Sequence, residues 1–185
     1  AAARLLMDLP QTDELLASLA GDTIVYLSAI TLSLYGDKGR ARLFTALSAV
    51  REKGTRVAFD TNFRARGWPD LDRARRVYQE MFAIADIVLA STEDLLPLYS
   101  GGDSAELLVQ IPSSETVLKL AEPACIVSAV GRTERVEAEP LAHPVVDTTA
   151  AGDSFAAAYL AARQNGASPV AAAQVGHRLA GIVVG

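Results

Sequence analysis

The chain of 185 residues is long enough to bury the core of one domain, and half of its residues are hydrophobic. Its net charge of −5, from 17 basic and 22 acidic side chains, is not that of a nucleic-acid or membrane-surface protein. The single cysteine, Cys125, excludes an internal disulfide and agrees with a reducing cytoplasm, and no apolar run approaches the length of a membrane span.

The first third of the chain predicts alternating helices and strands. Residues 7–20 have a weakly amphipathic helical pattern, and residues 23–27 read as a short buried strand. Small residues follow at 28–32, where either a ligand contact or a plain strand-to-helix connection fits. A helix is predicted over 38–53 and a strand over 56–59.

The predicted strand at 56–59 runs into D-T-N-F-R-A-R-G-W, residues 60–68. Ligands of open α/β sheets bind at the carboxyl ends of strands, and a guanidinium can hold a carboxylate through two parallel hydrogen bonds. Arg64 is therefore a candidate ligand for an acidic group. A solvated surface arginine explains the same residue without function.

The middle of the chain continues the alternation. A strongly amphipathic helix is predicted over 71–85 and a short buried strand over 87–90. The strand runs into S-T-E-D, where Ser91 with an acid three residues on resembles a helix capping box. The remaining elements predicted in this region are helices at 95–99 and 104–110, a strand at 116–120, and a β-hairpin of 125–129 and 132–137.

The most informative stretch is D-T-T-A-A-G-D-S-F, residues 147–155. It follows the apolar pair Val145-Val146, which predicts a strand end, and it opens a run of small helix-forming residues. This arrangement turns free N–H groups towards an anion, and Gly152 lets a phosphate approach the backbone closely. Asp153, beside a transferring phosphoryl group, is suited to accept the proton of an attacking hydroxyl. The alternative is an ordinary helix N-terminus capped by Asp147 or Thr149.

Residues 147–155 resemble the D-T-x-G-A-G-D signature of the ribokinase-like (PfkB) carbohydrate kinases. Ala150 stands where most members have Gly, a replacement similar to that of the branch phosphorylating 2-keto-3-deoxygluconate. The resemblance implies that Asp153 is the catalytic base. It also implies that the N–H groups of Ala151, Gly152 and Asp153 form the anion hole for the γ-phosphate of ATP, with Ala150 in the same loop.

The stretch at residues 60–68 resembles the F-D-x-N-x-R-x-x-L-W segment of fructokinases and keto-deoxy-gluconate kinases. The resemblance implies that Arg64 binds the acidic end of the substrate and that Asn62 belongs to the same site. Gly67 and Ala65 depart from the family's usual Leu and Pro, so the loop geometry departs with them.

Two further stretches match the family's motifs only in part, because some of the motif residues are replaced. Residues 91–94 stand where the family has N-x-x-E, which implies a nucleotide contact for Ser91 and a Mg²⁺ contact, through water, for Asp94. The family continues K-x-G-x-x-G at Lys119, which makes Lys119 a candidate on the nucleotide side, although solvated charge is the better explanation of this residue. Ala121 and Ala124 replace the two glycines of that turn.

The order of elements predicts a three-layer α/β fold with a mostly parallel sheet. The resemblance adds ribokinase-like topology. It implies that residues 1–185 are the central and C-terminal portion of a single kinase domain, whose N-terminal part and lid lie outside this chain. No Walker A or G-x-G-x-x-G motif is present, which argues against a P-loop kinase and a Rossmann dehydrogenase.

The function implied by the resemblance is ATP-dependent phosphorylation of 2-keto-3-deoxygluconate to 2-keto-3-deoxy-6-phosphogluconate. ATP and Mg²⁺ are the expected cofactors, and a monovalent cation such as K⁺ is left open. We expect a cytoplasmic homo-oligomer, formed through the absent lid, without nucleic-acid or membrane partners. One alternative is a same-family kinase acting on fructose, ribose or a nucleoside. Another is a non-catalytic nucleotide- or sugar-binding module, favoured by the missing turn glycines and disfavoured by Asp153.

Overall fold

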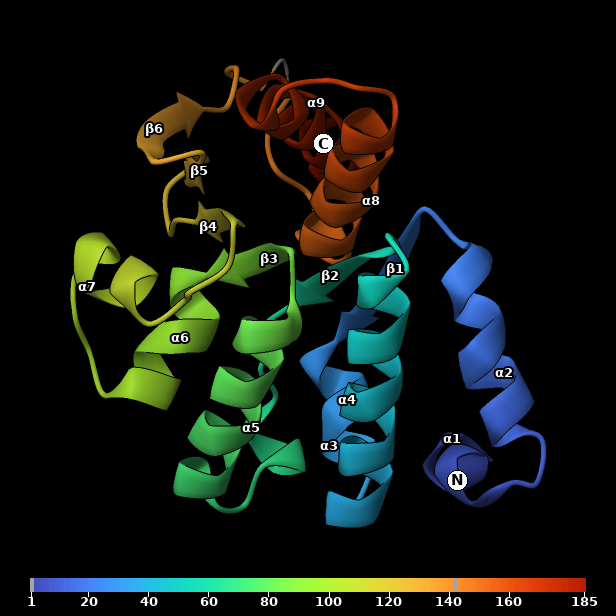
Figure 1. Ribbon diagram of the computed structural model, residues 1–185. Coiled ribbons are helices and arrows are strands. Elements are labelled where there is room, and N and C mark those ends of the chain that lie inside the picture. The colour runs from blue at the N-terminus through green and yellow to red at the C-terminus, as the bar shows by residue number, and fades with distance from the viewer. Residues whose placement is uncertain (1, 142) are drawn as a thin grey trace.

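The computed structural model describes residues 2–141 and 143–185. Its centre is a six-stranded sheet in which the strands follow one another in sequence order. The strands are β1 Ile24–Ser28, β2 Arg56–Asp60, β3 Ile87–Ser91, β4 Glu115–Lys119, β5 Ala124–Ala129 and β6 Arg132–Glu137. Strands β1 to β4 pair in parallel, whereas β4 with β5 and β5 with β6 pair antiparallel. The predicted α/β class is confirmed (Figure 1).

Helices cover the two faces of this sheet, with α3 to α6 on one side and α8 and α9 on the other (Figure 1). The α-helices are α1 Ala2–Leu5, α2 Thr12–Ser18, α3 Ala29–Leu34, α4 Asp37–Glu52, α5 Leu71–Ile84, α6 Thr92–Tyr99, α7 Ser104–Val109, α8 Ala151–Gln164 and α9 Pro169–Val184. Short 3₁₀ turns occupy Leu6–Asp8, Leu19–Gly21 and Ala65–Gly67.

Two buried clusters of apolar side chains lie on opposite faces of the sheet. Strand β3 shows the reason, because it contributes Val88 and Ala90 to one cluster and Ile87 and Leu89 to the other. Alternate residues of a strand point to opposite faces, so a strand buried on both faces reads as a continuous apolar run. The predicted three layers are therefore confirmed.

The long amphipathic helices lie where the pattern predicted them. The predictions at 38–53 and 71–85 correspond to α4 and α5. Helix α9 begins at Pro169, since the first turn of a helix tolerates a residue without an N–H. Helix α5 begins after Asp70, whose side chain accepts the N–H of Arg73 at 3.0 Å. The predicted hairpin is β5 and β6, joined at Val130 and Gly131, which both have positive φ (53° and 70°) as a tight hairpin turn requires.

Two predictions near the ends of the chain are wrong. The single helix over 7–20 is broken into a 3₁₀ turn and α2, because Pro10 has no N–H to donate and restricts the residue before it. The strand end predicted at Val145-Val146 is not a strand. Both side chains are exposed, and the N–H of Val146 donates to the carbonyl of Val184 at the end of α9 instead of to a neighbouring strand.

The small residues after β1 form a helix. Strand β1 ends at Ser28 and α3 begins at the next residue, so the plain strand-to-helix connection describes residues 28–32. Within the described ranges, no helix combines the length and the apolar character needed to cross a membrane.

Candidate active site

The carboxyl ends of the parallel strands meet at one edge of the sheet. Asp60 at the end of β2 pairs in register with Ser28 at the end of β1, and Ser91 at the end of β3 pairs with Lys119 at the end of β4. Beyond β4 the sheet becomes antiparallel. Polar groups from four strands that are distant in the sequence are thereby gathered where open α/β folds bind ligands.

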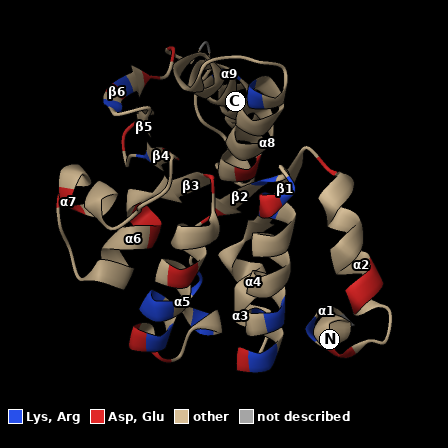
Figure 2. Ribbon diagram, in the orientation of Figure 1, with Lys and Arg blue, Asp and Glu red and all other residues tan. Residues whose placement is uncertain are grey.

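Helix α8 brings the predicted signature to this edge. A Cβ built on Gly152 would lie 3.6 Å from Nζ of Lys119, so the first turn of α8 contacts the end of β4. The end of α8 that meets the sheet between β1 and β3 is visible in Figure 1. The charged residues of α8 are Asp153 in its first turn and Arg163 in its last, and most of α8 and α9 carries no charge (Figure 2).

The start of α8 leaves backbone donors free. The N-cap residue is Ala150, whose φ of 62° is left-handed and whose side chain cannot accept a hydrogen bond. The N–H of Ala151 donates to the carbonyl of Thr148 at 3.2 Å. The N–H groups of Gly152 and Asp153 have no acceptor within the part of the chain that the structure describes. Two of the three predicted anion-hole amides are therefore available to a ligand.

The loop before α8 is shaped by Asp147 rather than capped by it. Oδ1 of Asp147 accepts the N–H of Thr149 at 2.8 Å, two residues before the helix begins. This hydrogen bond lowers the pKa of the exposed Asp147 carboxyl below its usual value. Neither Asp147 nor Thr149 is the N-cap of α8, so the ordinary capped helix start is not what the structure shows.

Asp153 is exposed and lies near two groups that the sequence did not single out, Asp60 and Tyr26. Burial raises the pKa of the Asp60 carboxyl, the nearby Lys119 lowers it, and the charges of Asp94 and Asp153 raise it further. Burial and the charges of Asp60 and Asp153 also raise the pKa of Tyr26. The charge of Asp153 therefore acts on both groups at this edge of the sheet.

Lys119 lies at the same edge of the sheet, at the end of β4. Its ammonium nitrogen lies 3.8 Å from Oδ2 of Asp60, and its side chain is largely buried. The same ammonium nitrogen lies close to Gly152. The structure therefore places Lys119, a predicted nucleotide-side residue, directly beside the start of α8.

The predicted substrate residues lie on the loop after β2. The guanidinium of Arg64 donates to the carbonyl of Phe63 at 2.9 Å, lies 3.8 Å from Oδ1 of Asp94, and keeps its side chain 64% exposed. Asn62 has a positive φ of 20°, and its buried Oδ1 has no hydrogen-bond donor among the described residues. Both side chains retain hydrogen-bonding capacity for a ligand.

Asp94 and Ser91 have structural partners. Oδ2 of Asp94 accepts from the hydroxyl of Thr61 at 2.8 Å, and Oδ1 accepts from the N–H of Phe63 at 2.9 Å. Ser91 is the N-cap of α6 and accepts the N–H of Asp94 at 3.1 Å. Ser91 is thus the N-cap of α6, as the capping interpretation predicted, but the Asp94 carboxylate accepts from Thr61 and Phe63 instead of completing a capping box. Asp94 thereby fixes the Thr61–Arg64 loop against α6.

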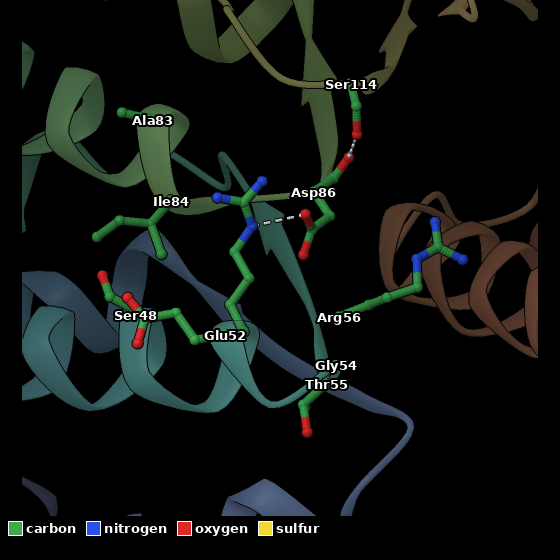
Figure 3. Close-up of a pocket in the computed structure, with 10 residues that line it drawn as sticks. Ser48, Glu52, Gly54, Thr55, Arg56, Ala83, Ile84, Asp86 and Ser114 are labelled. Carbon is green, nitrogen blue, oxygen red and sulfur yellow. Dashed lines mark hydrogen bonds and ion pairs between the residues drawn. The ribbon is translucent and has the colours of Figure 1, made fainter.

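A hollow of about 640 Å³ lies at the opposite edge of the sheet, away from these groups. It is lined by residues at the amino ends of the strands, among them Arg56 at the start of β2 and Asp86 just before β3. Two of the lining residues form an ion pair, in which Nε of Arg51 lies 2.7 Å from Oδ1 of Asp86. Figure 3 draws it as a dashed line at the labelled Asp86. Both arginines of this hollow are already paired, Arg51 with Asp86 and Arg56 with Glu115. The convergent polar groups at the carboxyl edge therefore identify the candidate site better than this hollow does.

Residues 2–185 match the family described as pfkB family carbohydrate kinase. A 2-dehydro-3-deoxygluconokinase of Dickeya dadantii is 38% identical over the whole chain, which spans 61% of that protein. A fructokinase of Vibrio alginolyticus is 31% identical over 74% of the chain, covering 45% of its own length.

Among solved structures, the aminoimidazole riboside kinase of Salmonella enterica, complexed with aminoimidazole riboside and an ATP analog, superposes with a TM-score of 0.75. It is 22% identical, and the match covers 87% of this chain and 56% of that one. This likeness shows a shared fold. The matches cover between 45% and 61% of the lengths of these three proteins, so the chain spans only part of its relatives.

Proposed function

This chain belongs to the pfkB family of carbohydrate kinases, and we propose that the whole protein phosphorylates 2-keto-3-deoxygluconate to its 6-phosphate with ATP. One observation carries the kinase chemistry: Asp153 stands in the first turn of α8, next to free backbone amides and to the ammonium of Lys119. A carboxylate base beside an anion-binding helix start is what phosphoryl transfer to a hydroxyl requires. The similarity to 2-dehydro-3-deoxygluconokinase over the whole chain supports the choice of substrate.

In this mechanism Asp153 accepts the proton of the substrate hydroxyl as that oxygen attacks the γ-phosphoryl group. The N–H groups of Gly152 and Asp153 donate to the phosphoryl oxygens, and the positive end of the α8 dipole favours their charge. Lys119 adds a full positive charge from the end of β4. Since the transition state of phosphoryl transfer is loose, this positioning and charge stabilisation supply most of the rate.

Magnesium fits this site as an ion bound mainly by ATP. Within the described ranges, no three acidic, histidine or cysteine side chains converge as a metal site, and both oxygens of Asp94 are engaged by protein donors. Mg²⁺ commonly keeps several waters and binds through substrate phosphates, so Asp94 would contact it through water. When bound, the ion supplies neutralising charge to the phosphates.

The sugar acid is expected to lie over the loop after β2. The exposed guanidinium of Arg64 would bind its carboxylate, and the unpaired Oδ1 of Asn62 would accept a hydrogen bond from a hydroxyl. Ala150, Ala151 and Ser91 would complete the nucleotide side. We further propose a cytoplasmic homo-oligomer, assembled through a lid outside this chain, with K⁺ as an optional activator.

The direct test is ADP release by the whole protein with MgATP, compared across 2-keto-3-deoxygluconate, gluconate, fructose, ribose and adenosine. We expect the highest kcat/KM with the keto-deoxy acid. Gluconate is the matched control, because it keeps the carboxylate and lacks the 2-keto-3-deoxy pattern. No turnover with any of the five would contradict the kinase proposal and favour a binding module.

A second candidate is a kinase for a neutral sugar such as fructose. The observation in its favour is the 31% identity to a fructokinase over 74% of the chain. A fructose preference in the same assay would keep Asp153 as the base and remove Arg64 as a carboxylate ligand.

A further inference from the structure

Asp60 is a buried carboxylate that the proposed mechanism does not use. It is the last residue of β2, at the carboxyl edge of the sheet where the candidate site lies, and its exposed fraction is 2%. A carboxylate so far from water needs compensating partners, because burial without them is costly. Its partners therefore indicate what it does.

Three groups from three segments face Asp60. The backbone N–H of Asn62 donates to Oδ1 at 3.1 Å, and the hydroxyl of Tyr26 in β1 lies 3.4 Å from Oδ2. The ammonium of Lys119 in β4 lies 3.8 Å from the same Oδ2. The carboxylate at the end of β2 thus contacts side chains from β1 and from β4.

The contact with Lys119 is an ion pair rather than a close hydrogen bond. A separation of 3.8 Å exceeds the donor–acceptor distance of a hydrogen bond, so the ammonium keeps its N–H donors for other acceptors. Opposite charges at this distance still attract strongly in a partly buried site. Asp60 can therefore hold Lys119 in position while leaving the N–H donors of its ammonium free for a ligand.

The free side of Lys119 faces the start of α8. A Cβ at Gly152 would lie 3.6 Å from Nζ, and the N–H groups of Gly152 and Asp153 next to it are free of protein acceptors in the described parts of the chain. The ammonium of Lys119, at the end of β4, and the two backbone amides at the start of α8 are thus close enough to bind the same anion. Either element alone would provide only part of an anion site.

We propose that Asp60 is a positioning residue that holds Lys119 against the first turn of α8, so that strand and helix form a single site for a nucleotide phosphate. The identity of the anion rests on the proposed function, whereas the coupling of Asp60 to Lys119 does not. Asp60 itself does not touch the phosphate, because its charge would repel it. Removing Asp60 frees the Lys119 side chain to leave the site.

The test is MgATP binding to the whole protein, measured by calorimetry for Asp60→Asn, Lys119→Met and the double variant. We expect each single variant to weaken binding by about tenfold, because Lys119→Met removes the ammonium from the phosphate and Asp60→Asn lets it leave the site. The double variant should bind no more weakly than Lys119→Met, because Asp60 acts only through Lys119. Wild-type affinity in Asp60→Asn, or losses that add in the double variant, would overturn the proposal.

Asp86→Asn is the matched control. Asp86 is also a carboxylate paired with a cation at the sheet, but it meets Arg51 at the opposite edge. Its replacement should leave MgATP affinity unchanged. If thermal unfolding shows that Asp60→Asn is not folded, Asp60→Glu takes its place. That variant keeps the charge but moves the carboxylate, so it should still weaken MgATP binding, and wild-type affinity in Asp60→Glu would contradict the proposal.

Turnover gives a second readout that a general loss of packing would not produce. Asp60→Asn should raise the KM for MgATP while leaving the KM for the sugar within about twofold of the wild type. A wrong assignment of the substrate can be told apart from a wrong role of Asp60, because the calorimetry measures MgATP binding without any sugar. A wild-type protein that binds MgATP but phosphorylates none of the sugars would contradict the proposed function and leave this inference open to its own test.

Discussion

Arg163 near the end of α8 holds Glu115 at the start of β4 through two hydrogen bonds, from Nε to Oε1 at 2.8 Å and from Nη2 to Oε2 at 2.7 Å. Glu115 is 5% exposed, and the hydroxyl of Tyr159 donates to it at 2.6 Å. At the other end of the same strand and helix, Lys119 faces Gly152. Polar contacts at both ends therefore set the position of α8 along the sheet, and with it the active-site turn.

Breaking this pair should destabilise the fold. Arg163→Met leaves Glu115 buried without its two-pronged partner, and we expect the free energy of unfolding to fall by about 3 kcal/mol, as for other buried ion pairs that lose one member. Urea denaturation measures the change. Arg135→Met, which removes an exposed arginine paired with Glu122 and Glu137, should leave stability almost unchanged. Equal effects of the two substitutions would contradict the buried clamp.

The same carboxylate should make stability depend on pH. Burial raises the pKa of Glu115, but the hydrogen bonds from Arg163 and Tyr159 and the charges of Arg163 and Arg56 outweigh it and leave the pKa below the ordinary value of 4.5. A depressed folded pKa means that the contribution to stability is complete above 4.5 and is lost as the pH falls through the folded value. The difference in unfolding free energy between wild type and Glu115→Gln should therefore shrink below that pH. A difference that stays constant down to about pH 3 would refute this assignment.

Removing the proposed base should stop chemistry and spare binding. Asp153→Asn keeps the size of the side chain but cannot accept the hydroxyl proton, so kcat should fall by about 10³-fold. MgATP affinity, measured by calorimetry, should be equal to or slightly tighter than that of the wild type, because a negative charge near the phosphates is removed. Residual turnover within tenfold of the wild type would show that another group is the base.

Arg64→Ala tests the carboxylate contact. Loss of a charged hydrogen-bonding partner should raise the KM for 2-keto-3-deoxygluconate by about 10- to 100-fold and leave the KM for MgATP unchanged. Steady-state kinetics on both substrates separate these effects. Arg66→Ala, in the neighbouring 3₁₀ turn, is the control and should behave as the wild type. An unchanged sugar KM in Arg64→Ala would leave the substrate carboxylate without this ligand.

Ala150→Gly should stabilise the protein. Ala150 has a left-handed φ of 62°, a conformation that costs an alanine about 1 kcal/mol and a glycine almost nothing. We expect a gain of about 0.5 kcal/mol in unfolding free energy, because glycine also gains freedom in the unfolded chain. Ala161→Gly, at an exposed position inside α8, should instead destabilise by about 1 kcal/mol. A loss of stability in Ala150→Gly would show that this backbone strain is absent.

Much of the fold could be predicted from the sequence where the signal is local. The apolar periodicity of α4 and α5, the turn between β5 and β6, and the proline that opens α9 all act within a few residues. The predictions failed where contacts with residues distant in the sequence determine the conformation of a segment. Val145-Val146 has the composition of a strand, but the N–H of Val146 donates to Val184 at the end of α9, and no strand within 2–141 and 143–185 pairs with this segment. The prediction of one helix over residues 7–20 did not take into account that Pro10 interrupts it.

Two residues of the candidate site were missed, Asp60 and Tyr26. A signal for Asp60 was available, because a lone carboxylate ending an apolar strand lies where α/β folds bind ligands. Tyr26 had none, since an aromatic residue in a short strand reads as core. Tyr26 is 44% exposed and contacts Asp60 because β1 is the outermost strand of the sheet, next to β2, and the sequence does not show this strand order.

The sequence by itself determined the small-residue turn before α8, the carboxylate in its first turn and the α/β class, because each depends on residues adjacent in the chain. Only the tertiary structure decided that Lys119 lies between Asp60 and Gly152, and that Arg163 holds Glu115. These contacts depend on the order of strands in the sheet and on the position of α8 across it. Strand order results from packing two apolar faces at once, so no local pattern encodes which strand ends meet.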